Sequence, residues 1–207
     1  MNHTLSIPLL DSCDASALEL NGAPFQVDKV NWPAEFPHAP FCAGKIARTA
    51  DALWIVWHVS GPGITVKNLK DGGTIWEDSC CEIFLQAPGS PDYYNIEVNA
   101  AGHLLVGKGP GRADRKLIPE SMNRIIRFGG VAAPVDIADE PLDWCIGIIV
   151  PFEAIGLDPE NLPDRLNGNI YKCGDKTAHP HFLSWAPVET PQPDFHRPEF
   201  FGTFLLK

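Results

Sequence analysis

Apolar and polar residues alternate along much of this chain, in short runs separated by turn-forming residues. An alternation with a period of two is the pattern of a β-strand that has one face in a core. The 18 glycines and 20 prolines interrupt the chain too often for long helices and are typical of short strands joined by turns. The runs that predict strands cover residues 52–59, 80–86, 93–100, 103–107, 123–128, 144–150, 168–173, 181–185 and 200–206.

The number and spacing of these runs predict an all-β fold with little helix, built as a two-sheet antiparallel β-sandwich. Residues 151–156 predict a single helical turn, because a proline starts it and a glycine ends it. Residues 136–143 predict an exposed acidic loop. A chain of 207 residues, of which 44% are hydrophobic, can bury one sizeable core. We therefore expect a single domain over residues 1–207, in which the less regular residues 1–30 form an N-terminal wrapping segment.

The formal net charge of −10 argues against nucleic acid as a partner, since lysines and arginines are also scattered rather than gathered on one stripe. The longest apolar runs, such as residues 146–150, are far shorter than the roughly 18 residues of a membrane span, so no membrane partner is expected. The first residues do not resemble a signal peptide, which predicts a cytoplasmic protein, or an extracellular or periplasmic one if a leader has been removed. We interpret the six cysteines, none of them in a Cys-x-x-Cys unit, as reduced and mostly buried thiols.

The strands predicted at residues 80–86 and 93–100 carry the candidate chemistry. Alternation places Glu82 on the face opposite the core, and it does the same for Asn95, Glu97 and Asn99 on the second strand. Trp76, just before the first strand, adds a flat ring. Such a combination suits a sugar, because C–H faces stack on indole while hydroxyl groups need paired donors and acceptors. An ordinary solvated sheet face would show the same alternation.

Four motifs follow one another over most of the chain. They are Trp76-Glu77-Asp78-Ser79 leading to Glu82, Tyr93-Tyr94-Asn95, residues 169–175, and residues 180–185 together with 193–202. In this order they resemble the carbohydrate-binding module family 9-like group, whose members are found attached to xylanases. The resemblance implies a jelly-roll-like β-sandwich that binds a mono- or oligosaccharide, such as a unit of xylan or glucan, and does not catalyse a reaction.

Carried over to this chain, the resemblance implies a sugar ring clamped between Trp76 and Trp185, with Glu82 accepting protons from its hydroxyl groups. The ligand-binding residues that we predict are Trp76, Trp185, Glu82, Asn95, Glu97 and Asn169. An arginine also contacts sugar in the family, and Arg112 and Arg124 are the candidates for it. Some members carry structural calcium, but no loop of this chain has the alternating oxygen-ligand spacing for it, so we predict no metal and no cofactor.

Several other conspicuous residues have simpler structural interpretations. Trp54 and Trp57 stand in an apolar run and are expected in the core, and Asp78 is expected to cap a turn. Residues 194–199 are expected to form a network of ion pairs and hydrogen bonds that fixes the loop before the last strand. His179 and His181 flank a proline and could face a metal, but a zinc site needs three or four ligands and only Cys173 suggests itself as another.

Two other classes of function stay open. A glycoside hydrolase needs two carboxyl groups about 5 to 10 Å apart across the scissile bond, and Glu77, Asp78, Glu82 and Glu97 are numerous enough to supply them. A haem-binding sandwich needs strong axial ligands, and the chain has only two methionines besides its histidines and lysines. We favour non-catalytic binding, because carboxylates also accept hydrogen bonds from sugar hydroxyl groups and no other catalytic motif accompanies them.

Overall fold

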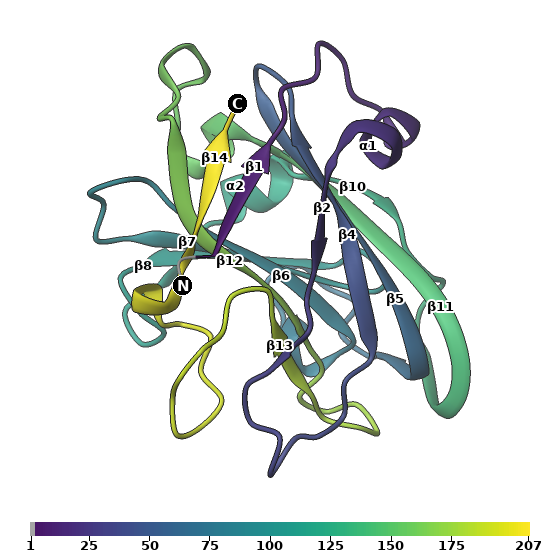
Figure 1. The fold of residues 1–207 in the computed structure, drawn as a ribbon. Coiled ribbons are helices and arrows are strands. Elements are labelled where there is room, and N and C mark those ends of the chain that lie inside the picture. The colour runs from purple at the N-terminus through teal and green to yellow at the C-terminus, as the bar shows by residue number, and fades with distance from the viewer. Residues whose placement is uncertain (1–2) are drawn as a thin grey trace.

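The computed structural model describes residues 3–207, which form two β-sheets packed against each other (Figure 1). The nine-stranded sheet has the order β1-β14-β12-β6-β7-β8-β9, with β13 paired to β12 and β3 paired to β13, and the five-stranded sheet has the order β10-β11-β5-β4-β2. The strands are β1 (Thr4–Ile7), β2 (Ala23–Gln26), β3 (Lys29–Val30), β4 (Phe41–Arg48), β5 (Ala52–Val66), β6 (Cys80–Gln86), β7 (Tyr93–Asn99), β8 (Leu104–Gly109), β9 (Lys116–Leu117), β10 (Ile126–Gly129), β11 (Val135–Pro151), β12 (Arg165–Cys173), β13 (Phe182–Ser184) and β14 (Gly202–Leu206).

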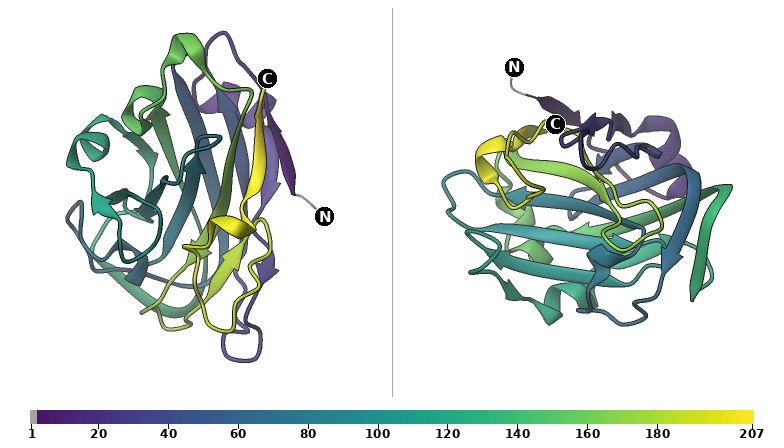
Figure 2. Two further views of the ribbon diagram at one scale, coloured as in Figure 1. Left: turned by 90° about the vertical axis from the view of Figure 1, so that its left-hand side faces the viewer. Right: turned by 90° about the horizontal axis from the view of Figure 1, so that it is seen from below.

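The helical segments are short and lie at the edges of the sandwich. They are α1 (Ala15–Asn21), α2 (Pro119–Arg124), η1 (Ile75–Glu77), η2 (Phe152–Ile155), η3 (Pro159–Asn161) and η4 (Pro198–Phe200). Two further views show the same ribbon from the side and from below (Figure 2). The predicted all-β, two-sheet sandwich with little helix is therefore confirmed, and the parallel pairing of β1 with β14 departs from the antiparallel pattern.

Two of the predicted segments are wrong in detail. The strand expected at residues 123–128 begins as the end of helix α2, which Pro119 starts at its first turn, and only then continues as β10. The acidic loop expected at residues 136–143 is exposed, but it lies inside the long strand β11, which pairs with β5 on both sides of a register shift between Ile137 and Pro141. The acidic residues of this segment correctly predicted that it is exposed. Its extended backbone conformation comes from pairing with β5, which the local sequence did not reveal.

The main core fills the space between the two sheets. Trp57, Ile83, Ile96, Ile146 and Phe204 are all buried in it and come from both layers. Trp57 confirms its prediction, whereas Trp54 lies on the other face of β5, is partly exposed and packs near Phe128. The predicted helical turn at 151–156 is also confirmed, because η2 ends at Gly156 with a left-handed φ of 72°.

A second apolar cluster lies on the opposite face of the nine-stranded sheet. Phe84, Tyr93 and Tyr171 are fully buried there, although each alternates along its strand with residues of the main core. Residues from two long connections cover them, including Trp32 from the segment before β4 and Phe195 from the segment before β14. This face of the sheet is therefore not solvated, and polar side chains on it are buried as well.

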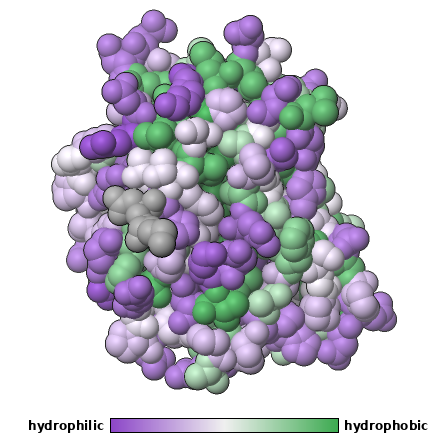
Figure 3. All heavy atoms as spheres, viewed as in Figure 1, coloured by the Kyte–Doolittle hydropathy of each residue, from purple (hydrophilic) through white to green (hydrophobic). Residues whose placement is uncertain are grey.

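The described residues of the N-terminal segment contribute strands to both sheets, β1 and β3 to the larger and β2 to the smaller. Residues 1 and 2 of the predicted wrapping segment lie outside the described residues. On the face drawn in Figure 3, hydrophilic residues are mixed with small apolar areas. Among residues 3–207, no helix is long and apolar enough to cross a membrane.

Candidate functional site

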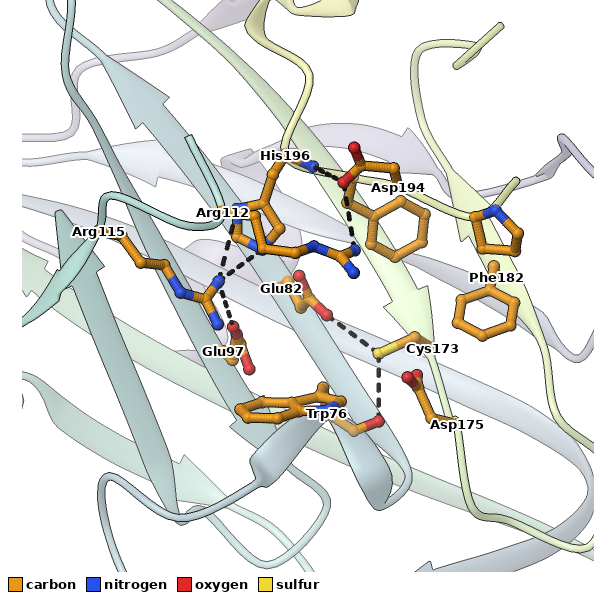
Figure 4. A pocket seen from close by; sticks show the side chains of 12 residues that line it. Trp76, Glu82, Glu97, Arg112, Arg115, Cys173, Asp175, Phe182, Asp194 and His196 are labelled. Carbon is orange, nitrogen blue, oxygen red and sulfur yellow. Dashed lines mark hydrogen bonds and ion pairs between the residues drawn. The ribbon is translucent and has the colours of Figure 1, made fainter. Parts of the chain in front are cut away.

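A cavity of about 210 Å³ opens on the covered face of the nine-stranded sheet. Its wall is formed by strands β6, β7 and β12, and its rim by η1, the β8–β9 connection and the segment before β14 (Figure 4). The lining residues are Trp76, Glu82, Glu97, Arg112, Arg115, Cys173, Asp175, Phe182, Pro193, Asp194, Phe195 and His196.

Strand pairing brings the two glutamates together. Glu82 on β6 lies directly opposite Glu97 on β7, and both alternate with residues of the main core, so both side chains point to the covered face. They are only 3% and 2% exposed. Glu82 accepts a hydrogen bond from the Cys173 thiol at 3.0 Å, and Oε1 of Glu97 accepts one from Asn95 Nδ2 at 2.8 Å. The predicted polar face is thus confirmed as a cluster, but it is a buried one.

The second carboxylate oxygen of Glu97, Oε2, is buried and takes part in no hydrogen bond within the described part of the chain. Burial, and then the neighbouring charge of Glu82, raises the pKa of Glu97 well above its usual range. Burial likewise raises the pKa of Glu82 to about 7 and that of Asp175 to about 6. The cavity therefore holds carboxyl groups that lack the partners they would have in water.

Cationic and donor groups face these carboxyl groups from the rim. Arg115 Nη1 lies 3.7 Å from Glu97 Oε1 and also contacts the ring of His196. His196 Nδ1 is 2.7 Å from the Tyr93 hydroxyl oxygen, and burial, followed by the charge of Arg115, lowers the pKa of His196 to about 3. The imidazole is thus neutral at neutral pH. Arg112, which is largely exposed, pairs with Asp194 at 3.2 Å.

Trp76 supplies the aromatic surface. It belongs to η1, is partly exposed, and has its ring along one side of the cavity, with Arg112 and His196 on the other side in Figure 4. The Arg115 guanidinium carbon lies 5.9 Å from the centre of the Trp76 ring. The backbone carbonyl of Trp76 accepts a hydrogen bond from the amide of Asp175 at 3.1 Å, which fixes η1 to the end of β12. The ring is therefore held in place by its backbone and remains open to the cavity.

Trp185 does not share this cavity, so the predicted clamp of Trp76 and Trp185 is wrong. Trp185 is 8% exposed and belongs to the core between the sheets, where it stacks on Phe204 with ring centres 5.2 Å apart. Gly202 leaves room for it, because a Cβ atom there would lie 2.4 Å from the indole. The alternation that puts Leu183 in the core puts Trp185 on the same side, and this signal was present in the sequence.

The two predicted asparagines support the structure instead of lining the cavity. Asn169 is fully buried and uses both ends of its amide on backbone groups of Ile170 and Ala186. Asn95, also fully buried, stands behind Glu97 and orients it. Trp76, Glu82 and Glu97 are thus the predicted residues that the structure brings together.

Of the candidate arginines, Arg112 reaches the cavity and Arg124 does not, because Arg124 pairs with Glu153. Arg115 and Asp175 were missed. Asp175 directly follows the strand that carries Cys173, but Arg115 lies on a connection whose path the alternation of the strands does not determine.

The other structural interpretations mostly hold. Asp78 is structural, but it does not cap its own turn. It is 1% exposed and accepts hydrogen bonds from the backbone amides of Lys67 and Asn68, which directly follow the long strand β5. The expected network at 194–199 is present, with Arg197 bonded to Glu199, but the same segment also lines the cavity through Asp194 and His196. The histidines 179 and 181 are occupied by protein partners, and all six cysteines are free, four of them buried.

A β-sandwich with an aromatic ring, carboxylates and guanidinium groups around one small cavity has the features of a domain that binds a polar small molecule with a flat apolar face. The chain belongs to the carbohydrate-binding family 9, whose model matches residues 13–206.

Solved structures agree with this assignment. The chain is similar to a putative carbohydrate-binding protein from Bacteroides uniformis, with a TM-score of 0.90, 29% identity and full coverage of both chains. It has the fold of a family 9 carbohydrate-binding module from Caldicellulosiruptor kristjanssonii. The complex of that module with glucose gives a TM-score of 0.64 at 11% identity, covering 99% of this chain and 96% of the module. The complex with cellotriose gives 0.65 at 12% identity, covering 99% and 94%. A search among curated proteins gave no match.

Proposed function

We propose that this protein is a non-catalytic carbohydrate-binding domain that holds one sugar residue in the cavity beside Trp76. The observation that supports it most directly is the grouping of Trp76, Glu82 and Glu97 around one opening. A cavity of about 210 Å³ is smaller than the roughly 300–1,000 Å³ of pockets for drug-sized ligands, which suits a single ring with the remainder of a chain outside. The sugar-bound family members of the same fold support the choice of ligand.

Each group has a defined role in this proposal. The Trp76 ring stacks on the C–H face of the sugar, which is worth about 1 kcal/mol beyond the buried area. The free oxygen Oε2 of Glu97 and the carboxylate of Glu82 accept hydrogen bonds from hydroxyl groups, while Arg115 and Arg112 donate to ring and hydroxyl oxygens. A sugar would thus provide the partner that Glu97 lacks within the protein.

The arrangement of the glutamates favours binding over hydrolysis. Hydrolysis needs two carboxyl groups that flank the scissile bond from different sides. Glu82 and Glu97 instead stand side by side, since they are register partners on neighbouring strands and project from the same sheet face. Both can therefore contact one side of a ligand together.

The test is calorimetry of the purified protein with gluco-, xylo- and manno-oligosaccharides. We expect dissociation constants in the range of about 1 μM to 1 mM for at least one sugar. Trp76→Ala should weaken that affinity about 5- to 30-fold, the equivalent of about 1–2 kcal/mol. Trp54→Ala is the matched control, because Trp54 is also a partly exposed tryptophan but belongs to the five-stranded sheet.

Either of two results would overturn the proposal. No heat with any sugar of the panel would remove the ligand class, and equal affinities for wild type and Trp76→Ala would remove the stacking role. Release of reducing sugar that is abolished by Glu82→Gln would show that the site is catalytic and would replace the non-catalytic assignment with a hydrolase.

A further inference from the structure

Two thiols and a carboxylate converge beside the wall of the cavity. Cys80 and Cys173 are register partners on β6 and β12, and Glu82 follows Cys80 by two residues, so all three side chains project from the same sheet face. One ligand atom from each of the three lies within 4.8 Å of the others, and the distance from Cys173 Sγ to Glu82 Oε1 is 3.0 Å. All three residues are buried.

From this geometry we infer that Cys80, Cys173 and Glu82 form a binding site for one thiophilic divalent cation of the zinc type. Thiolate sulfur and carboxylate oxygen are common ligands of such ions, at about 2.3 Å and about 2.0–2.2 Å from the metal. In a tetrahedral site these bond lengths place the ligand atoms about 3.6–3.8 Å from one another. The three atoms already lie close to such an arrangement, so small side-chain rotations suffice to close it.

The surroundings give the ion a path of entry and a further ligand position. Cys173 and Glu82 line the cavity, so an ion reaches them from solvent without opening the core. The three protein ligands leave at least one coordination position, which we expect on the cavity side, where Cys173 and Glu82 line the opening and where water or a ligand oxygen can occupy it. Three protein ligands with one open position distinguish this site from a closed structural zinc site with four protein ligands.

The reaction is a proton exchange without a change of oxidation state. One M²⁺ replaces the protons of the two thiols, so that two S–H bonds break, two metal–sulfur bonds form and two H⁺ leave to solvent. Glu82 adds an oxygen ligand, releasing a third H⁺ to solvent in those molecules in which its carboxyl group is protonated, and the hydrogen bond from the Cys173 thiol to Glu82 is replaced by coordination of both groups to the ion. Two thiolates, one carboxylate and the ion carry one net negative charge, which the guanidinium of Arg115 on the cavity side partly balances.

The remaining cysteines provide the comparison. Cys42 and Cys81 are buried in the main core among apolar side chains, and Cys145 is exposed on the five-stranded sheet. Among residues 3–207, Cys80, Glu82 and Cys173 form the one group of at least three histidine, cysteine, aspartate or glutamate side chains with this close spacing. The thiols of Cys42 and Cys81 also lie close enough to interact, so a metal held there would have two sulfur ligands as well, but its binding would be unaffected by Cys173→Ser.

The experiment uses the full chain, reduced and freed of metal, and titrates it with Co²⁺. We expect one Co²⁺ per chain, a sulfur-to-cobalt charge-transfer band in the near ultraviolet, and intense visible bands of four-coordinate cobalt, all displaced by Zn²⁺. Cys173→Ser should weaken Co²⁺ affinity at least about 10-fold and reduce the intensity of the charge-transfer band, because only one of the two sulfur ligands remains. Cys145→Ser, the matched control, should leave both unchanged. Glu82→Gln should retain the charge-transfer band but weaken Co²⁺ affinity.

X-ray absorption on the wild-type complex, compared with that of Glu82→Gln, tests the ligand set even if the cysteine variants fail to fold. We expect two sulfur neighbours at about 2.3 Å together with oxygen neighbours. Absence of a charge-transfer band, a sulfur count other than two, or a folded Cys173→Ser with an unchanged band and unchanged Co²⁺ affinity would overturn the site. Sugar titrations are done on the metal-free protein, so a failure to bind sugar leaves this result unaffected, and the reverse also holds.

Discussion

Trp185 belongs to the core and Trp76 to the cavity, so truncation of Trp185 should affect stability and not binding. We predict that Trp185→Ala destabilises the fold without removing the sugar site. The indole is 8% exposed, stacks on Phe204 and meets the imidazole of His3 edge-on at 5.5 Å. Gly202 packs directly beneath it. Truncation would leave a cavity that these neighbours fill only partly, because each is fixed in the sheet or against it.

The expected loss follows from the size of the side chain and its burial. Replacement of a buried tryptophan or phenylalanine by alanine typically costs about 3–5 kcal/mol, and we expect Trp185→Ala to fall in this range. Total stabilities of about 5–15 kcal/mol leave a folded population for the variant under mild conditions. Trp185→Phe keeps a ring on Phe204 and should cost less than half as much as the alanine variant.

The assay is urea unfolding followed by far-ultraviolet circular dichroism, because removal of a tryptophan would distort fluorescence. Sugar affinity is then measured by calorimetry under conditions in which circular dichroism shows that the variant is folded, and it should stay within about twofold of wild type. A free energy of unfolding within about 1 kcal/mol of wild type would refute the core assignment. So would a folded variant whose affinity falls as far as that of Trp76→Ala.

Two further predictions concern buried polar residues. His181→Gln should remove part of the acid sensitivity of the fold. Burial holds the pKa of His181 in the folded protein well below its ordinary value near 6.5. As the pH falls through 6.5, His181 therefore takes up a proton in the unfolded chain but not in the folded protein, and this favours unfolding. Between about pH 7.5 and about pH 5.5 wild type should lose about 1.3 kcal/mol more than the variant in urea unfolding, and equal losses would contradict this. Asp78→Ala should cost about 2–5 kcal/mol, because Asp78 is buried and its removal leaves the backbone amides of Lys67 and Asn68 and the buried side-chain amide of Asn99 without their acceptor. The exposed control Asp139→Ala should stay within about 0.5 kcal/mol. A cost for Asp78→Ala no larger than that of the control would show that water replaces the carboxylate.

The alternation of side chains predicted the fold class and the wall of the site well. Successive side chains of a strand point to opposite faces of the sheet whichever strands lie beside it, so this property can be read from the local sequence. Glu82 and Glu97 were correctly placed on the face opposite Ile83 and Ile96, and the register then put them side by side. Trp76 could be recognised because it directly precedes this strand. The positions of these residues in the fold follow from the local sequence and from the pairing of strands that are neighbours in the chain.

The errors arose where distant segments meet. The order of motifs suggested that Trp185 stacks on the sugar as a second ring. Trp185 lies two residues after Leu183, however, so alternation places both side chains on the core face of the strand. Arg115 and His196 reach the cavity from two long connections, and the path of a connection depends on packing that alternation does not report. The exposed end of β11 looked like a loop because its composition is acidic, but β5 extends far enough to pair with it.

Burial is what turns an ordinary polar sheet face into a site. On a solvated face, Glu82 and Glu97 would be hydrated and their charges screened. Here the connection that carries Phe195 covers the sheet, so both carboxyl groups are buried, the pKa of Glu82 rises to about 7, and Oε2 of Glu97 has no hydrogen-bond partner among residues 3–207. An unpaired buried acceptor costs the folded protein about 1–3 kcal/mol. A ligand that donates a hydrogen bond to this oxygen recovers that cost, so the polar group that destabilises the free domain is the one that gains most from a bound hydroxyl group.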